Sequence, residues 1–483
     1  MMHGRIWTLL HTWLCHRHHW CPHSHTVRLQ ADPAFDIKVS TIELQASPGD
    51  CSFIYANPLE PVARRRPAVI VIPGGGLSSI AFANAGFGPW NGLRANPSAL
   101  AAPQLYLDVG GLGYTTWEGS ATSYPQGDKP LVAAYSECIV ALRDKFSITS
   151  SALLGVSYGG KLARLLQNSL AQTLMNENFV RHVFAVTPFF DPYYTMAYIP
   201  IPGDGELYAI KGKNASRLKQ LRDDFRLALC APRTAESGEC TKSNWPAAWL
   251  YMDQGGLFAK FTDELLGFKM PRRLLASGVP LRFSQFSALS INLWSIKQYE
   301  KATTGTCFNN NDPKDAWEVP ASLKKTQGLL DFDLMTPTEA KLMSRSSCMM
   351  NSEAWNQTAY PDNSYVRGVN ITNNEGVPLT VFAGGADVIC SAAGLTQQFA
   401  DQKGLGKACA GGAIPSSAAG SMQSCTEYSD GSLLLVIRDG THLAMLDHSA
   451  TAQAIAETMV HLLDAQAAGQ SSSPGVDSIP SRS

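Results

Sequence analysis

The segment GVSYGG, residues 155–160, places a serine between two glycines. The apolar run before Ser157 predicts a buried strand, and the leucines at helical spacing after it predict a helix. A chain that turns directly from a strand into a helix strains the turn residue and exposes its side chain at the carboxyl edge of a sheet, and nearby glycines relieve the crowding. The pattern therefore predicts Ser157 as a nucleophile that faces a ligand.

A serine hydroxyl needs a base that removes its proton. Seven of the eleven histidines lie in the first 25 residues, so four candidates remain. Only His442, in RDGTHLAML, comes just after a buried apolar run, which places it at the same expected sheet edge as Ser157. The other three open a strand or belong to the last helix: His182, His448 and His461. We favour His442 as the base, and a loop histidine with a structural role is the alternative.

An acid must orient this base, and in this arrangement it should follow a strand end and lie between the serine and the histidine along the chain. Asp387, in FAGGADVIC, meets both conditions. Asp191, in PFFDP, is the second candidate, and Asp439 lies too near His442 in sequence to be favoured. Ser157, Asp387 and His442 are thus the predicted catalytic residues.

Acyl transfer also needs backbone N–H groups that already face the developing oxyanion. The N–H of Tyr158, directly after the nucleophile, is one predicted donor. The other is expected from a glycine turn whose missing side chains let a substrate approach the backbone: Gly74, Gly75 and Gly76. Glycine triplets also occur in ordinary loops, so this second assignment depends on the catalytic residues.

Strand and helix patterns alternate around these residues. Nearly continuous apolar runs predict strands covered on both faces, and they span 68–73, 105–109, 151–155, 183–186, 377–385 and 433–437. Helical spacing predicts three helices: one from Leu131 to Phe146, one with Leu162, Leu165, Leu166 and Leu170 on one face, and a last one with Ile455, Met459 and Leu463 on one face and Ser449 as N-cap. The alternation predicts an α/β fold with a mostly parallel central sheet flanked by helices.

Interruptions of this pattern predict the parts of the chain. They are a leader at 1–34, a core at 35–191 and 377–467, an inserted cap at 192–376 and a disordered tail at 468–483. The core begins with two alternating segments, which predict an antiparallel hairpin at a sheet edge. Within the core, RRRP at 64–67 is expected to be exposed, and a Gly/Ser/Ala-rich loop is expected at about 403–431.

Composition limits the partners. With 483 residues, 45% hydrophobic and 16% charged, the chain can bury a large core. Thirty-nine basic and forty acidic residues create no field that attracts nucleic acid or an anionic membrane. No apolar run reaches the roughly 18 residues of a membrane-spanning helix. A small uncharged or mixed-charge partner is therefore expected, and the oligomeric state is left open.

Eleven cysteines and three Asn-x-Ser/Thr acceptors favour an oxidising, glycosylating compartment, either extracellular or vacuolar and lysosomal. The acceptors are Asn214, Asn356 and Asn370. Two pairs are close enough in sequence to close local loops: Cys230 with Cys240, and Cys409 with Cys425. Because eleven is odd, at least one thiol is expected to be free.

The first 25 residues point to neither a good signal sequence nor a metal site. In IWTLLHTWL, His11 interrupts the apolar core and no small-residue cleavage site follows. CHRHHWCPHSH, at 15–25, is rich in metal-binding side chains, but its spacings match no closed zinc pattern. A removed or disordered leader is therefore predicted, and no metal.

Five segments together resemble the serine carboxypeptidases. PGGGLSSIAFANAGFGPW is similar to that family's Asn-Gly-Gly-Pro-Gly-Cys-Ser-Ser segment, LYLDVGGLGYTTW to its Leu-Asp-Gln-Pro and Val-Gly-Phe-Ser-Tyr stretch, and GVSYGG to Gly-Glu-Ser-Tyr-Ala-Gly. AGGADVIC resembles Ala-Gly-Asp-x-Asp-x-Ile-Cys, and DGTHLAMLDHSATAQAIAETM resembles the segment from the family's histidine into its last helix. The likeness covers about 40–190 and 360–465 in the same order.

This resemblance implies an α/β-hydrolase fold with an inserted cap. It also implies that Ser157, Asp387 and His442 form a catalytic triad, with Gly75 and Tyr158 as oxyanion donors. No cofactor is expected, because serine, histidine and backbone amides supply the whole reaction.

The substrate-binding positions depart from the family pattern. The resemblance implies that an Asn before the glycines, a Glu before the nucleophile and a second Glu downstream grip the terminal carboxylate of a peptide. Those places hold Pro73, Val156 and Gly86. Proline lacks a donor, valine cannot hydrogen-bond through its side chain, and no close carboxyl pair can form that shares a proton and favours acid pH. Pro73 and Val156, with Gly74 and Gly76, are therefore predicted to line a site of altered specificity.

Three hypotheses follow. The leading one is a serine hydrolase of the carboxypeptidase type that cleaves a peptide or small acyl substrate through an acyl-Ser157 intermediate. The second is an esterase or acyltransferase, because the carboxylate grip is missing. The third is a binding protein that kept the fold without turnover.

Overall fold

The structure is a computed structural model of the 483-residue chain. The residues that it describes are 35–47, 49–59, 66–74, 79–84, 102–109, 128–175, 178–191, 194, 220, 368–372, 376–385, 387, 390–438, 440, 442, 444–445 and 450–471. The predicted leader, nearly all of the predicted cap and the last twelve residues, 472–483, lie outside this set. The predictions for those segments stay predictions, whereas residues 468–471, predicted as the start of the disordered tail, are helical.

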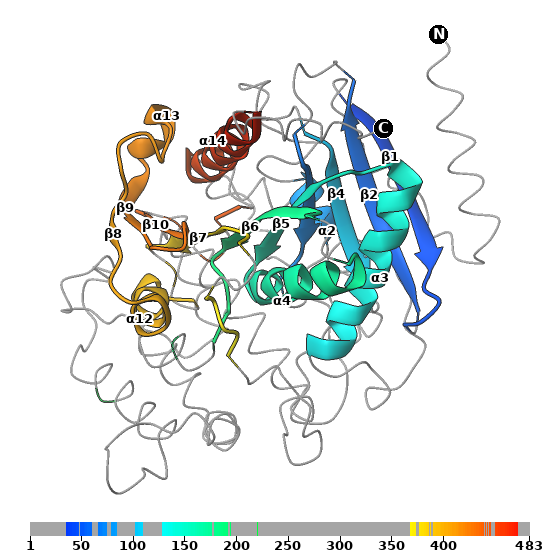
Figure 1. The fold of residues 1–483 in the computed structure, drawn as a ribbon, viewed down its shortest axis with the longest axis horizontal. Helices are drawn as coiled ribbons and strands as arrows, with labels where there is room; N and C mark the ends of the chain where they lie inside the picture. The colour runs from blue at the N-terminus through cyan, green and yellow to red at the C-terminus, as the bar shows by residue number, and fades with distance from the viewer. Residues whose placement is uncertain are drawn as a thin grey trace, which may run out of the picture. The chain divides into compact units, whose positions relative to one another are not determined.

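The described part of the chain forms a ten-stranded sheet in the order β1-β2-β4-β3-β5-β6-β7-β10-β9-β8 (Figure 1). The strands are β1 (Phe35–Glu43), β2 (Asp50–Pro58), β3 (Ala68–Ile72), β4 (Gln104–Val109), β5 (Ser151–Val156), β6 (Val180–Val186), β7 (Leu379–Gly384), β8 (Lys407–Ala408), β9 (Met422–Glu427) and β10 (Leu433–Ile437). Sheet neighbours from β4 to β10 are parallel, whereas β1 and β2 at one edge and β8 and β9 at the other are antiparallel. The predicted mostly parallel sheet and edge hairpin are confirmed.

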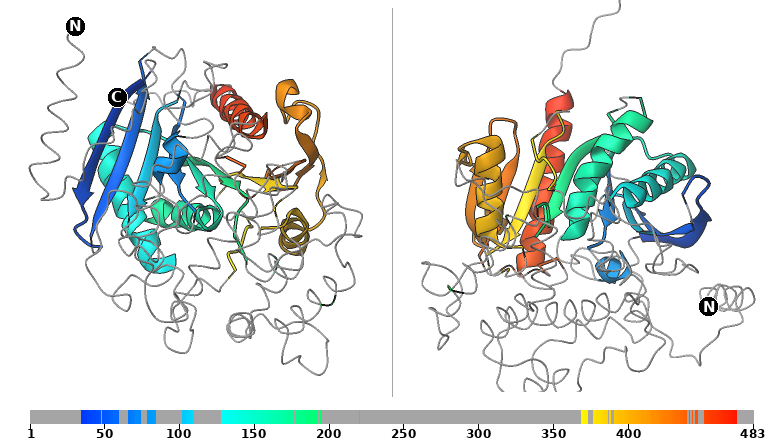
Figure 2. Two further views of the ribbon diagram at one scale, coloured as in Figure 1. Left: turned by 180° about the vertical axis from the view of Figure 1, so that it is seen from behind. Right: turned by 90° about the horizontal axis from the view of Figure 1, so that it is seen from below.

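Helices cover both faces of this sheet (Figures 1 and 2). On one face lie α3 (Asp128–Phe146), α4 (Tyr158–Thr173) and α12 (Ala392–Lys403), whose apolar side chains join alternate strand residues in one core cluster. On the other face lies α14 (Ala450–Ser471), and two short helices are α2 (Ser79–Asn84) and α13 (Ser416–Ala419). Successive side chains of a strand point to opposite faces. Strands such as β3, with the sequence AVIVI, therefore need helices on both sides.

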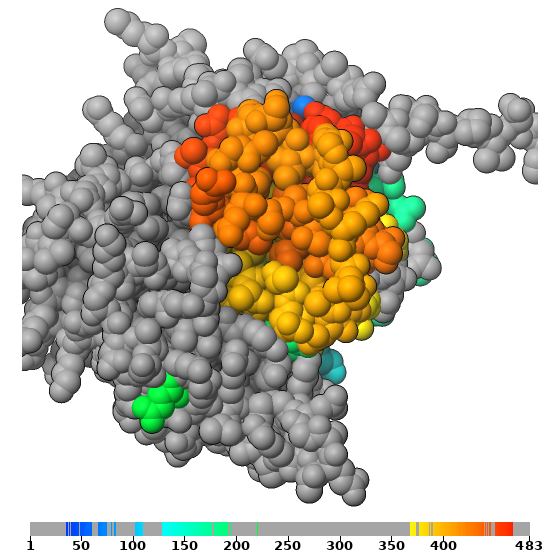
Figure 3. Space-filling model, turned by 90° about the vertical axis from the view of Figure 1, so that its left-hand side faces the viewer, coloured from blue at the N-terminus to red at the C-terminus, as the bar shows by residue number. Residues whose placement is uncertain are grey.

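The region between 403 and 431 corrects one prediction. Instead of a loop, the structure has β8, α13 and β9, and β9 pairs with both β8 and β10. The sequence of β9, MQSCTE, is mostly polar and only Met422 of this strand is buried, so a search for apolar runs does not detect it. Figure 3 shows this end of the sheet, with α12 in yellow, β8 and β9 in orange and α14 in red.

Arg66 corrects a second prediction, because it belongs to the segment expected to be exposed. Its side chain is only 10% exposed. The guanidinium donates to both carboxylate oxygens of Asp464 in α14, from Nε at 2.7 Å and from Nη2 at 2.8 Å. This bidentate ion pair ties the start of β3 to the last helix. Ser449, the predicted N-cap of that helix, lies outside the described residues.

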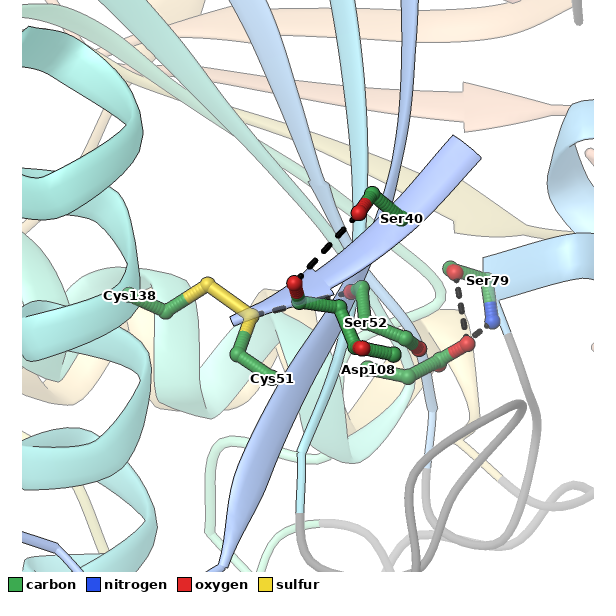
Figure 4. The surroundings of a disulfide bond; sticks show 7 residues. Ser40, Cys51, Ser52, Ser79, Asp108 and Cys138 are labelled. Carbon is green, nitrogen blue, oxygen red and sulfur yellow. Dashed lines mark hydrogen bonds between the residues drawn. A yellow bond between two sulfur atoms is a disulfide. The ribbon is translucent and has the colours of Figure 1, made fainter. Parts of the chain in front are cut away.

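Two disulfides lie among the described residues. Cys409–Cys425 confirms a pairing expected from the short sequence distance. Cys51–Cys138 joins β2 to α3 across a sequence separation of 87 residues (Figure 4), and the sequence alone did not predict it. Cys390 is a buried free thiol. Two cysteines of another expected pair lie outside the described residues: Cys230 and Cys240.

One of the three glycosylation acceptors is described. Asn370 is exposed, and its Oδ1 accepts hydrogen bonds from the N–H of Thr372 at 2.8 Å and from its hydroxyl at 2.7 Å. Asn214 and Asn356 lie outside the described residues. None of the described helices combines the length and the apolar character that a membrane span requires.

Candidate active site

Ser157 occupies a tight turn between β5 and α4. Its backbone has φ 54° and ψ −123°, a conformation that residues other than glycine rarely adopt. Its N–H donates to the carbonyl of Val186 in β6 at 2.9 Å, and its own carbonyl accepts from the N–H groups of Gly160 and Phe189, both at 2.9 Å. Strained residues persist where their surroundings hold them, and they concentrate at functional sites. These three backbone hydrogen bonds supply that restraint.

Two glycines make the turn possible by close backbone approach. A Cβ atom at Gly155 would lie 2.1 Å from the carbonyl oxygen of Gly159. A Cβ atom at Gly159 would lie 2.3 Å from the carbonyl oxygen of Pro73. Both distances are far below van der Waals contact. The first turn of α4 can therefore pack against the ends of β5 and β3 only where these side chains are missing.

The three predicted catalytic residues meet at one edge of the sheet. Nε2 of His442 lies 2.9 Å from Oγ of Ser157, and Nδ1 of His442 lies 2.9 Å from Oδ2 of Asp387. Ser157 follows β5, Asp387 follows β7 and His442 follows β10. Parallel strands end at the same edge, so residues far apart in sequence come together there. A proton on Nδ1 bonded to Asp387 leaves the lone pair of Nε2 directed at the serine hydroxyl.

Asp387 is enclosed and further oriented by the backbone. It is 1% exposed, and its second oxygen, Oδ1, accepts a hydrogen bond from the N–H of Cys390 at 2.9 Å. Burial first, and then the charge of Asp387, raise the pKa of the Cys390 thiol well above its ordinary value. Cys390 is therefore a neutral thiol and not a second nucleophile, because the thiolate is the reactive form.

The other acid candidates are placed elsewhere or not described. The carboxylate that accepts a hydrogen bond from Nδ1 of His442 is that of Asp387. Asp191 is buried, and it packs so closely on Gly368 that a Cβ atom there would lie 2.0 Å from Oδ2 of Asp191. Asp439 lies outside the described residues.

Of the residues predicted to supply oxyanion donors, the structure describes Tyr158 and Gly74. Tyr158 is the first residue of α4, where N–H groups have no acceptor within their own helix. Gly74 is buried directly after β3. Gly75 and Gly76 lie outside the described residues, and so does Gly86.

A buried aspartate anchors the chain just beyond the glycine turn. Asp108, at the end of β4, accepts hydrogen bonds from the N–H of Ser79 at 2.7 Å and from its hydroxyl at 2.8 Å (Figure 4). Ser79 is the first residue of α2, and Asp108 is 1% exposed. Sequence reasoning did not single out this aspartate, although its place directly at the end of a buried strand is a usable signal.

Sequence reasoning also missed Thr187, which holds the backbone of His442. Its hydroxyl donates to the carbonyl oxygen of His442 at 3.0 Å, and its N–H donates to the carbonyl of Phe382 at 2.7 Å. Thr187 is 0% exposed and has φ 45°, an outlier for a β-branched residue. A polar residue directly after the buried strand β6 was the available signal.

The predicted substrate-binding positions that the structure describes are buried, whereas Gly76 lies outside the described residues. Val156 ends β5 and is 1% exposed, so its side chain belongs to the protein interior. Pro73 is also buried, and its carbonyl oxygen faces Gly159. Neither side chain offers a hydrogen bond to a substrate carboxylate.

One group of potential metal ligands exists among the described residues, and it overlaps the catalytic residues. Asp387, Cys390 and His442 have ligand atoms within 4.8 Å of one another. The Nδ1 atom of His442 and the carboxylate of Asp387 are hydrogen-bonded to each other, and the Cys390 thiol is held neutral. Two of these three residues are therefore already engaged with each other.

No family model and no curated protein matches the chain. Solved structures with similar folds include a proline iminopeptidase-related protein from Thermus thermophilus, with a TM-score of 0.41, 12% identity, and coverage of 89% of this chain and 99% of that one. An esterase from Exiguobacterium antarcticum has a TM-score of 0.38, 12% identity, and coverage of 88% and 100%. Epoxide hydrolase from Vigna radiata has a TM-score of 0.37, 12% identity, and coverage of 89% and 98%. Similarity at this level does not identify a reaction.

The chain's own geometry carries the fold assignment. A mostly parallel sheet is covered by helices on both faces, a strained serine lies between a strand and a helix, and serine, aspartate and histidine follow in that order along the chain. This is the α/β-hydrolase fold.

Proposed function

We propose that this protein is a serine hydrolase that acts through an acyl-Ser157 intermediate. The observation that carries the proposal is the continuous chain of hydrogen bonds from Ser157 Oγ to His442 and on to Asp387, 2.9 Å at each step, with the serine held at φ 54°. Distances of this size allow direct proton transfer from the serine to the imidazole.

The proposed reaction uses these groups in sequence. Ser157 Oγ attacks the carbonyl carbon of the substrate while its proton passes to Nε2 of His442. The N–H of Tyr158 donates to the oxyanion of the tetrahedral intermediate. When that intermediate collapses, the leaving group takes the proton from His442, and a water molecule then repeats the sequence to release the acid. Asp387 keeps the imidazole in the required tautomer and stabilises its positive charge.

The sequence resemblance favours a peptide substrate with a free terminal carboxylate, as in serine carboxypeptidases. Five similar segments in the same order support this choice of substrate class. The first candidate reaction is therefore removal of the C-terminal residue of a peptide.

A specific observation favours a second candidate, an esterase or acyltransferase. The residue before the nucleophile is Val156, which is 1% exposed, and the residue before the glycine turn is Pro73. Neither can grip a carboxylate, and no carboxyl pair forms between them. An uncharged ester would avoid the need for this grip.

Comparing two matched substrates tests both candidates. We would measure kcat/KM for a blocked dipeptide with a free carboxylate and for its C-terminal ester, at pH 5 and pH 7.5, with Ser157→Ala as the control. Preference for the free acid at pH 5, lost in the variant, supports the carboxypeptidase. Cleavage of the ester alone, best near neutral pH, supports the esterase.

Labelling separates catalysis from binding. A fluorophosphonate should modify Ser157 in the wild-type protein and should not modify Ser157→Ala. Unchanged hydrolysis in Ser157→Ala would refute the mechanism. Absence of both labelling and turnover in the folded wild-type protein would instead support a binding protein on this fold.

Disulfides support a proposed location for this activity. Cys51–Cys138 and Cys409–Cys425 are the kind of cross-link that persists in oxidising compartments. Asn370, within an Asn-x-Thr acceptor, is exposed. We therefore place the enzyme in the secretory pathway, where a glycosidase that removes N-linked glycans should reduce its apparent mass.

A further inference from the structure

A buried ion pair joins the first residue of α3 to the first turn of α4, the helix that begins directly after Ser157. Oδ2 of Asp128, the first residue of α3, lies 2.8 Å from Nζ of Lys161 in α4, and the two side chains are 3% and 1% exposed. Burial of an aspartate or a lysine is strongly unfavourable unless the charge is paired. Apolar side chains would join two helices without that desolvation. The position of this pair beside the turn of Ser157 therefore indicates a role other than helix packing.

The same carboxylate also holds Tyr158. The Tyr158 hydroxyl donates to Oδ1 of Asp128 at 2.5 Å, a hydrogen bond strengthened by the negative charge. Tyr158 and Lys161 are three residues apart in the first turn of α4, so they lie on one face of that helix. Asp128 thus contacts this turn at two points, and one of them is the residue that directly follows the nucleophile.

Other contacts already hold α3 and α4 together. Both helices contribute apolar side chains to the core cluster, among them Ile139 and Leu166. Farther along both helices, the hydroxyls of Ser136 and Ser169 lie 2.9 Å apart. The ion pair differs from these contacts because it restrains the N-terminal end of α4, beside the strained backbone of Ser157.

Restraint at this end matters for an oxyanion donor. Such a donor contributes only if its position is set before the reaction begins. A displacement of about 1 Å is enough to lower a rate by about 100-fold. The N–H and the side chain of Tyr158 belong to one residue, so fixing the side chain at Asp128 also limits how far the N–H can move.

We propose that Asp128 and Lys161 are positioning residues that hold the N–H of Tyr158 where the oxyanion develops. This inference rests on the proposed function, in which that N–H is an oxyanion donor. Neither residue touches the substrate, and both act through Tyr158.

Three variants test this role, with Ser136→Ala as a matched control. Tyr158→Phe removes the hydrogen bond to Asp128 and keeps both charges. Asp128→Asn combined with Lys161→Met removes both charges together, so that neither remains buried without a partner. Ser136→Ala removes a hydrogen bond between the same two helices, farther from Ser157. If the double variant does not fold, the Tyr158→Phe variant alone tests the proposal.

For each variant we would measure kcat and KM for an ester, the inhibition constant of an alkyl boronate, and the melting temperature. The tetrahedral boronate adduct of Ser157 places an oxygen in the oxyanion site. Tyr158→Phe and the double variant should each lower kcat about 10-fold with KM within about twofold, because only one of the oxyanion donors is displaced. The affinity for the boronate should fall by the same factor. Ser136→Ala should lower the melting temperature and leave kcat unchanged.

Two results overturn the proposal and are distinguishable. If Tyr158→Phe lowers the melting temperature while kcat and boronate affinity stay within about twofold of wild type, the ion pair is purely structural and only this inference fails. If the folded wild-type protein neither hydrolyses esters nor reacts with a fluorophosphonate, the proposed function fails and this inference fails with it.

Discussion

Thr187 supports the position of His442 from outside the triad. Its hydroxyl donates to the His442 carbonyl at 3.0 Å, in a site that is 0% exposed. A buried acceptor that loses its donor is destabilised by about 1–3 kcal/mol. The imidazole would then no longer be held at its distance from Ser157.

Thr187→Val should therefore lower kcat about 10-fold and leave KM nearly unchanged, because the change affects proton transfer rather than substrate binding. Thr187→Ser keeps the hydroxyl and is the matched control, with kcat within about twofold of wild type. Steady-state kinetics on one ester substrate measures both. A loss of kcat in Thr187→Ser together with wild-type kcat in Thr187→Val would show that packing of the methyl group, not the hydrogen bond, matters.

At the scale of elements, the junction of β5 with α4 depends on Gly159. A Cβ atom there would lie 2.3 Å from the carbonyl oxygen of Pro73, and backbone cannot move aside as a flexible side chain can. Gly159→Ala should lower the free energy of unfolding by about 3 kcal/mol. Urea denaturation measures this.

Gly420→Ala is the matched control for that substitution. A Cβ atom at Gly420 has nothing within 4 Å, and its backbone lies in the right-handed helical region at φ −64°. The free energy of unfolding of Gly420→Ala should equal that of the wild-type protein or be slightly higher. Equal stability of the two variants would contradict the close approach of α4 to β3.

His182 links the stability of the central sheet to pH. It lies in β6 at 3% exposure, with Nε2 2.9 Å from the hydroxyl of Thr380 in β7. Burial lowers the pKa of His182 to about 3, and the side chain of Gln466 in α14 opposes that effect only in part. The unfolded chain therefore binds a proton at a higher pH, near 6.5, than the folded protein does.

The stabilisation from neutral His182 is present above about pH 6.5 and is lost as the pH falls from there toward 3. The free energy of unfolding should decrease by about 1 kcal/mol per pH unit in this window. His182→Gln should flatten the slope, whereas Thr380→Val should lower stability at every pH and keep the slope. Urea midpoints between pH 4 and pH 8 give the comparison. An unchanged slope in His182→Gln would assign the acid sensitivity to other groups.

At the scale of the whole molecule, the two disulfides constrain loops of very different length. Cys51–Cys138 spans 87 residues and joins β2 to α3, whereas Cys409–Cys425 spans 16 residues. In the chain-entropy account, a cross-link stabilises the fold more when it closes a longer loop. The difference between these two loops corresponds to about 1.5 kcal/mol.

Replacing Cys51 and Cys138 by alanine should therefore lower the melting temperature more than replacing Cys409 and Cys425. Differential scanning calorimetry of the two double variants, against the wild-type protein, measures the order. The reverse order would mean that the corner formed by β8 and β9 is the more cooperative part of the fold.

Local patterns in the sequence determined the elements and the turn that carries Ser157. Periodicity identified the buried strands and the helices α3, α4 and α14, because each pattern depends on residues within one or two turns or strand repeats. The glycines around Ser157 indicated the strained turn for the same reason, since steric crowding there is a short-range effect. The order of serine, aspartate and histidine along the chain then named the three residues that the structure brings together.

Only the tertiary structure decided which distant groups meet. Arg66 pairs with Asp464 of α14, and Asp128 contacts both Lys161 and Tyr158, although no sequence pattern predicted either pairing. Cys51 finds Cys138 because β2 lies beside α3. Such pairs depend on helix packing across a sheet and on burial that removes competing water, and no local pattern encodes either. The sequence names the nucleophile, and the packed fold supplies the groups that hold it.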